Sequence, residues 1–207
     1  MLGPLRVSIR REGTVPSDFK WFVYGKHPMF ADYFSLGEQT HFAMAYRKWV
    51  TFGYQQYINS GGPGKQVCSY RFWSKGDSTT SVAVGLLQSS ADSLGRPFPL
   101  LLMGTVQLSS WRKVWPAFAG ALENLWAGLE KIAGERYPSL QDISTELSRI
   151  SLPALPERHS AQSGPEAVPN AVFTGGSKEK STVIRFTGPL TTQDFVRLWN
   201  VETALIA

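Results

Sequence analysis

The alternation of apolar and polar positions along this chain predicts its strands. Leu5, Val7 and Ile9 alternate with polar residues, which is typical of a strand buried on one face. A second apolar run follows the turn residues 13–18, and we expect the two strands to form a hairpin. Further along, residues 82–87 and 100–103 have no polar interruption, which indicates central strands buried on both faces. The predicted strands cover residues 5–11, 19–24, 67–74, 80–88 and 98–108.

Apolar residues three or four positions apart predict three helices before residue 150. In the first, Phe42, Ala45 and Trp49 share one stripe. In the second, Pro116 lies close enough to the start to be tolerated in a first helical turn. Ser139 is placed to cap the third helix. The predicted helices cover residues 38–58, 111–133 and 140–150.

The last quarter of the chain differs in composition from the part before it. Residues 151–170 contain four prolines and no apolar period, which predicts a linker loop. Short apolar runs at 171–174 and 182–187 predict a hairpin that turns at a pair of glycines. Either Thr191 or Thr192 is placed to cap a final helix over 193–200.

The order of these elements predicts the fold class. Strand, strand, helix, three strands and two helices is the layout of longin or SNARE-like domains. We therefore expect an α/β fold of the α+β type, a single-domain α/β/α sandwich with a largely antiparallel central sheet. The predicted parts are a core over residues 1–150, a linker over 151–170, and a C-terminal hairpin and helix over 171–207 that pack back on the core.

Two turns carry an unusual density of charged, glycine and proline residues. The first follows the apolar run that ends at Tyr24, and the second precedes the strand that begins near Leu100. Glycine permits a positive φ and proline fixes its own φ, so both turns are predicted to be rigid. An Asp–Arg pair between the turns would fit a planar guanidinium to a carboxylate. Such a pair either holds the two loops together or forms part of a surface that binds a partner.

The two turns resemble the signatures of a known family. Residues 25–33 resemble G-K-x-P-x-x-x-D-[FY], and residues 90–100 resemble S-x-D-x-x-G-R-x-F-P-L, of the TagF/ImpM proteins associated with bacterial type VI secretion. The residues of interest in the two motifs are Gly25, Lys26, His27, Pro28, Asp32, Asp92, Gly95, Arg96, Phe98 and Pro99.

This resemblance implies regulation rather than enzymatic turnover. TagF-like proteins are cytoplasmic accessory factors that repress type VI secretion after translation, and they act through the FHA-domain scaffold of the system. The implied function is therefore that of a non-enzymatic repressor that docks a rigid face on this scaffold. Lys26, His27, Asp32 and Arg96 are the first candidates for that face, because charged residues on fixed loops suit specific recognition. The alternative function is a structural adaptor that assembles the secretion apparatus through another protein.

Composition excludes several other classes of function. No apolar run in the 207 residues approaches the roughly 18 that a membrane helix needs, and residues 1–11 lack the apolar region of a signal peptide, so we expect a cytoplasmic protein. The single cysteine, Cys68, lies in a predicted strand and is expected to be a buried thiol. The net charge of +5 resides in the N-terminal part of the chain, where it could meet an acidic partner, a phosphate or a nucleic acid, but its basic residues are scattered, which favours a solvated surface. The three histidines are not spaced as metal ligands, and no nucleophile, base and orienting group can be assembled, so no metal, cofactor or catalytic residue is predicted.

Overall fold

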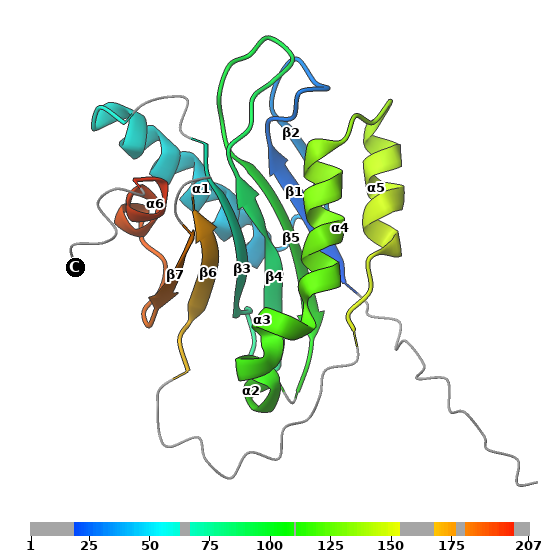
Figure 1. Cartoon of the computed structure of the whole chain (residues 1–207), viewed down its shortest axis with the longest axis vertical. Helices are drawn as coiled ribbons and strands as arrows, with labels where there is room; N and C mark the ends of the chain where they lie inside the picture. Colours follow the sequence, from blue (N-terminus) through cyan, green and yellow to red (C-terminus); the bar gives the residue numbers. More distant parts are fainter. Residues whose placement is uncertain (1–18, 63–66, 110, 154–167, 177–180, 201–207) are drawn as a thin grey trace, which may run out of the picture.

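The structure, a computed structural model, describes residues 19–62, 67–109, 111–153, 168–176 and 181–200. One seven-stranded sheet lies between two layers of helices (Figure 1), and every neighbouring pair of strands is antiparallel. The predicted α/β/α sandwich with an antiparallel sheet is confirmed. In spatial order the strands are β2 (Phe34–Gly37), β1 (Lys20–Gly25), β5 (Leu100–Gln107), β4 (Ser81–Gln88), β3 (Ser69–Lys75), β6 (Ala171–Gly176) and β7 (Ser181–Phe186).

The helices divide between the two faces of the sheet. One face is covered by α1 (His41–Asn59) and α6 (Thr192–Trp199), which pack on each other. The other face is covered by α4 (Glu123–Gly134) and α5 (Leu140–Arg149), and α4 contacts β4 and β5. Three short elements lead into α4, namely α2 (Trp111–Val114), the 3-10 helix η1 (Trp115–Ala117) and α3 (Phe118–Ala121).

Each face of the sheet has its own hydrophobic core. In β4, Ala83 and Leu87 point into the core under α1 and α6, whereas Val84 and Leu86 point into the core under α4. This burial on both faces explains the uninterrupted apolar run of β4, because successive side chains of a strand point to opposite sides. The core under α1 is rich in aromatic rings. For example, the ring of Phe173 in β6 stacks on the ring of Phe72 in the neighbouring strand β3.

Hydroxyl caps fix where several helices begin. The side chain of Thr40 accepts a hydrogen bond from the backbone of Ala43 at the start of α1. Thr191 and Asp194 form a reciprocal capping box at the start of α6. Ser139 caps α5 as the sequence predicted.

The N-terminal hairpin is not the one that the sequence predicted. The expected strand over residues 5–11 lies outside the described residues. β1 pairs instead with β2, a short strand that the sequence analysis missed, and with β5. The four residues Phe-Ser-Leu-Gly of β2 are too few to show a clear period of two.

The single helix predicted over residues 111–133 is also wrong, because this segment contains three helical pieces and a 3-10 turn. The first break coincides with Pro116, which has no N–H for the carbonyl four residues earlier and shifts the chain into the 3-10 turn η1. A second break follows at Leu122, whose backbone leaves the helical region.

The C-terminal hairpin extends the main sheet. Gly175 and Gly176, predicted to form its turn, instead continue β6 and pair with β3 and β7. Residues 177–180, which connect the two strands, and residues 154–167 of the predicted linker lie outside the described part of the chain. The pairing of β6 with β3 makes β6 and β7 part of the main sheet.

Candidate functional site

Strand pairing brings the two motif turns together. The first turn connects β1 to β2, and the second connects β4 to β5; both lie at the same end of the sheet (Figure 1). Gly25 at the end of β1 is opposite Leu100 at the start of β5, so the two turns leave the sheet side by side. Gly25 has φ +134°, and a Cβ at this position would lie 2.0 Å from the carbonyl oxygen of Pro99. Only glycine allows this close approach.

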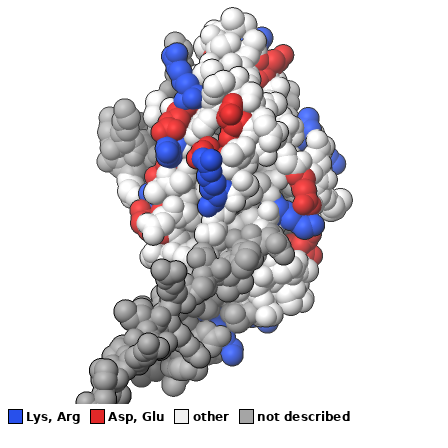
Figure 2. All heavy atoms as spheres, turned by 90° about the vertical axis from the view of Figure 1, so that its right-hand side faces the viewer, with Lys and Arg blue, Asp and Glu red and all other residues white. Residues whose placement is uncertain are grey.

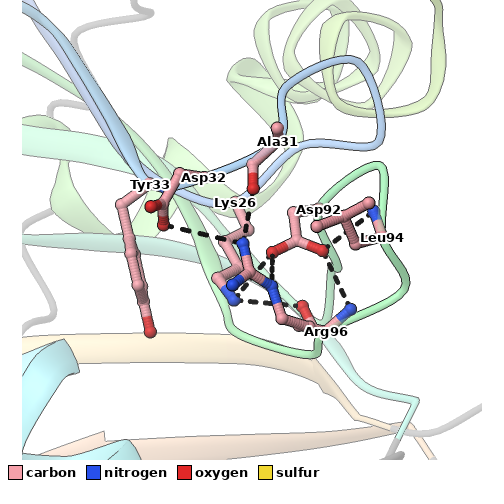
Figure 3. Close-up of polar contacts among 7 residues, drawn as sticks. All are labelled: Lys26, Ala31, Asp32, Tyr33, Asp92, Leu94 and Arg96. Carbon is pink, nitrogen blue, oxygen red and sulfur yellow. Dashed lines mark hydrogen bonds and ion pairs between the residues drawn. The ribbon is translucent and has the colours of Figure 1, made fainter.

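Asp92 is the centre of the polar network between the turns (Figure 3). Its Oδ1 accepts hydrogen bonds from the backbone N–H groups of Leu94, at 3.1 Å, and Arg96, at 2.9 Å. Its Oδ2 accepts from Nε of Arg96 at 2.7 Å and lies 3.0 Å from Nζ of Lys26. The carboxylate is fully buried, yet both oxygens have two donors each. Asp92 therefore stabilises the second turn and connects it, through Lys26, to the first turn.

The ionisation of Asp92 follows from these contacts. Burial by itself raises the pKa of this carboxyl group, because it disfavours the charged form. The hydrogen bonds from the backbone and side chain of Arg96 and from Lys26 outweigh burial and hold the pKa of Asp92 well below its usual range. The network therefore contains a permanent carboxylate at neutral pH.

Lys26 helps to hold the two turns together. This position differs from the exposed one that the sequence predicts for it. Its side chain is only 5% exposed. Nζ lies 3.0 Å from Asp92, donates to the backbone carbonyl of Arg96 at 3.4 Å, and lies 4.6 Å from the centre of the Tyr33 ring. A lysine is rarely buried unless its charge is paired, and here Asp92 supplies the pair.

His27 is also buried, contrary to the exposed position expected for it. Its Nδ1 accepts a hydrogen bond from the backbone N–H of Met29 at 3.3 Å, while Nε2 has no hydrogen-bond partner among the described residues. Burial lowers the pKa of His27, and the nearby backbone of Ile132 only partly offsets this effect. His27 therefore packs the first turn against α4 as a neutral ring.

Arg96 and Asp32 are the two charged motif residues that reach the surface. Their side chains are 52% and 72% exposed, and Nη2 of Arg96 lies 4.0 Å from Oδ1 of Asp32. The Asp–Arg pair predicted between the turns is thus present but loose. Arg96 bonds more closely within its own turn, to Asp92, and its Nη2 donates across the gap to the carbonyl of Ala31. The side chain of Arg96 is held from two sides (Figure 3).

The remaining motif residues shape the turns. Phe98 is buried and meets the rings of Tyr24 and Tyr33 edge to face. Gly95 has φ +76° and allows the second turn to close on Asp92. Pro99 lies against Gly25, while Pro28 is exposed.

Sequence reasoning missed two exposed apolar side chains beside Arg96. Leu94 is 69% exposed and Tyr33 is 50% exposed. Both follow a polar residue within the two predicted turns, and an apolar side chain placed in a turn was the available signal. We call Asp32, Tyr33, Leu94 and Arg96 together the turn surface.

A cavity of about 290 Å³ lies on another side of the second turn. Its lining includes Tyr54, Phe98, Pro99 and Trp199, and none of its described lining residues is charged or a histidine. Elsewhere, no group of three or more His, Cys, Asp or Glu side chains in the described part of the chain could hold a metal ion. Cys68 is buried, and burial raises the pKa of its thiol to about 12.

Charges of both signs are interspersed on the side of the molecule that α5 occupies (Figure 2). Ion pairs such as Lys131–Glu135 at the end of α4 and Arg149–Glu146 on α5 account for part of this pattern. Among the described residues on this face, no single-sign patch of the kind typical of nucleic-acid binding is present. None of the described helices is long and apolar enough to cross a membrane.

Comparison with known proteins identifies the family. A family model described as the TagF N-terminal domain, type VI secretion system-associated, matches residues 23–150. The chain belongs to the TagF family. The matched region contains both motif turns, so the resemblance seen in the sequence is confirmed, and the protein is associated with type VI secretion.

A solved structure has the same fold as this TagF-family chain. The crystal structure of PA0076 from Pseudomonas aeruginosa PAO1 superposes with a TM-score of 0.67, covering 90% of this chain and 97% of that one. The two sequences are 19% identical, so this likeness establishes the fold alone. No curated protein matches the sequence.

Proposed function

We propose that this protein is a non-enzymatic accessory factor of type VI secretion that binds the FHA-domain scaffold in the cytoplasm and thereby represses secretion after translation. Membership of the TagF family supplies the association with type VI secretion. The observation that supports a binding role is the turn surface, where Arg96 is half exposed but held by Asp92 and Ala31.

A preformed surface suits recognition of a protein partner. Asp92 and Lys26 fix both turns before any partner arrives, and the backbone N–H of Ser93 donates to the carbonyl of Phe30 at 2.9 Å as a further link. Binding then costs little additional loop or side-chain entropy. The exposed tyrosine and arginine also belong to the residue types that dominate the binding energy of protein interfaces.

The proposed lack of catalysis is supported by the chemistry near the motifs. The cavity beside the second turn is lined without a charged or histidine side chain among the described residues, so no carboxylate, ammonium or imidazole group is available there for proton transfer. The ionised carboxylate of Asp92 faces Lys26 and Arg96 and has no access to solvent. A buried carboxylate with four donors holds structure and cannot reach a substrate.

The deciding experiment is a calorimetric titration of this protein with the FHA-domain scaffold of the same secretion cluster. We expect saturable binding that weakens as the ionic strength rises toward about 0.15 M, because charges near the surface are screened by salt. In cells, overproduction of the protein should lower secretion while the transcripts of the secretion genes stay constant. Absence of heat together with absence of co-elution would contradict the proposal and favour an adaptor that binds another component.

A further inference from the structure

We infer that the scaffold docks an acidic segment on the turn surface, with a carboxylate of that segment bound to the guanidinium group of Arg96. This inference rests on the proposed function and names the chemistry of the partner. It commits to aspartate or glutamate on the partner, since a planar guanidinium matches a carboxylate with two parallel hydrogen bonds.

Arg96 has donors to spare. A guanidinium group carries five N–H bonds. Nε donates to Asp92 and Nη2 donates to Ala31, while Nη1 has no acceptor among the described residues. The free donors lie on a side chain that is 52% exposed. An incoming carboxylate therefore finds unused N–H groups in a fixed orientation.

The orientation of Arg96 does not depend on the partner. Asp92 holds Nε from within the second turn, and the carbonyl of Ala31 holds Nη2 from the first turn. Because both anchors belong to turns joined by Lys26, the guanidinium plane is set by the fold. A receptor that is already in place loses less side-chain entropy when a carboxylate binds.

Asp32 occupies the neighbourhood of Arg96 without satisfying it. The separation of 4.0 Å between Oδ1 and Nη2 is too long for a hydrogen bond, and the same Oδ1 accepts from the backbone of Tyr33 at 2.8 Å. An exposed, loose ion pair contributes little in water. A partner carboxylate can therefore displace Asp32, and Asp32 acts as an internal competitor that also repels the incoming charge.

The surroundings of Arg96 favour a segment with apolar residues next to the acidic one. Leu94 and Tyr33 are both at least half exposed, and the ring of Tyr33 is held edge to face against Phe98 at 4.7 Å. Fixed apolar and aromatic groups around a charged contact exclude water from it, which is the arrangement of a tight interface. The chain also carries a net charge of +5, which complements an acidic partner.

Two pairs of charge-neutralising variants test this inference by calorimetric titration with the scaffold. The test pair is Arg96→Gln and Asp32→Asn. The matched control pair is Lys131→Gln and Glu135→Gln, which neutralise an exposed ion pair with a similar separation of 3.9 Å at the C-terminal end of α4. We expect Arg96→Gln to weaken binding about 10-fold and Asp32→Asn to strengthen it about 3-fold, whereas the controls bind as the wild type does. Arg96→Lys, which keeps the positive charge but loses the planar group that donates two parallel hydrogen bonds, should also weaken binding.

The outcomes separate this inference from the proposed function. Wild-type protein that does not bind the scaffold overturns the proposed function, and this inference falls with it. Wild-type binding that is unchanged in Arg96→Gln and Arg96→Lys overturns only the inference. The gain in affinity of Asp32→Asn guards against a folding artefact, because a misfolded variant does not bind more tightly. If phosphatase treatment of the scaffold abolishes binding, the ligand of Arg96 is a phosphate and the carboxylate assignment is wrong.

Discussion

Two ion pairs in the same two turns have opposite environments. Lys26 and Asp92 are 5% and 0% exposed, and their charged atoms are 3.0 Å apart. Arg96 and Asp32 are 52% and 72% exposed, at a separation of 4.0 Å. Each pair joins a residue of the first turn to a residue of the second. The buried pair holds the turns together, and the exposed pair leaves its charges available to a partner.

The difference shows that burial decides what a charged motif residue does. A buried charge must keep its partner, because an unpaired charge in the protein interior is strongly destabilising. An exposed charge is solvated whether or not it is paired, so it can exchange one partner for another at little cost. The fold therefore divides the charged motif residues into buried ones that hold structure and exposed ones, a division that the sequence motif does not show.

The largest expected contrast is between the two aspartates. Asp92→Asn should lower the melting temperature by about 10 °C, because Lys26 then lies buried without a counter-ion. Asp32→Asn should change it by no more than about 2 °C, since this carboxylate is already solvated. Calorimetric melting of both variants at neutral pH measures the contrast. Equal melting temperatures would show that the buried pair does not hold the turns.

A second contrast concerns two glycines with positive φ. Gly25→Ala should lower the melting temperature by about 8 °C, because its Cβ would collide with the Pro99 carbonyl oxygen in addition to the backbone strain. Gly95→Ala should lower it by only about 3 °C, since nothing lies within 4 Å of a Cβ there and only strain remains. Thermal melts followed by circular dichroism test the order. If Gly95→Ala proved the more damaging change, the close approach of the turns at Gly25 would be in doubt.

The smallest expected effect is a dependence of stability on pH that comes from His27. Burial lowers the pKa of this residue in the folded state below the ordinary value of 6.5. The unfolded chain therefore binds a proton that the folded chain does not, so the stability is complete above about pH 7 and falls as the pH drops through about 6.5. Asp92 loses its charge in the folded state only at far lower pH, so its contribution is lost below about pH 4 and does not interfere.

His27→Gln should remove this part of the slope. We expect the fall in melting temperature between about pH 7.5 and pH 5.5 to be a few degrees smaller in His27→Gln than in the wild type. His41→Gln, which replaces an exposed histidine at the start of α1, is the matched control. A slope that persists unchanged in His27→Gln would mean that His27 is not the group that titrates.

Local sequence signals predicted the central part of the fold well. Strands β4 and β5 followed from their uninterrupted apolar runs, and α1 and α5 followed from apolar spacing and turn or cap signals. Where the signal was short or ambiguous, prediction failed. β2 has only four residues, and Pro116 is compatible both with the first turn of a long helix and with a break in it.

The two motif turns were located from the sequence, but the burial of their charged residues was not predicted. The family signatures pointed to both turns, and the glycine and proline positions indicated rigid loops. The burial of Lys26 and His27 depends on the pairing of Gly25 with Leu100, which joins segments 75 positions apart in sequence. No local pattern encodes that pairing, and lysine is ordinarily an exposed residue. Tyr33 and Leu94 gained significance only once Arg96 was placed between them.

The place of β6 in the sheet has a consequence for synthesis on the ribosome. β6 pairs with β3, and Ser74 lies opposite Ala171. One edge of β3 therefore stays unpaired until a strand almost a hundred residues later has been translated. The aromatic layer beneath α1 is likewise incomplete until Phe173, Phe195 and Trp199 emerge. A nascent chain that ends at residue 150 therefore presents an open strand edge and uncovered aromatic rings, which are the features that chaperones recognise and that drive misassembly. β6, β7 and α6 therefore complete the sheet and the aromatic core only after the rest of the core has been translated, and gene fusions or truncations at residue 150, where the matched family region ends, would prevent this.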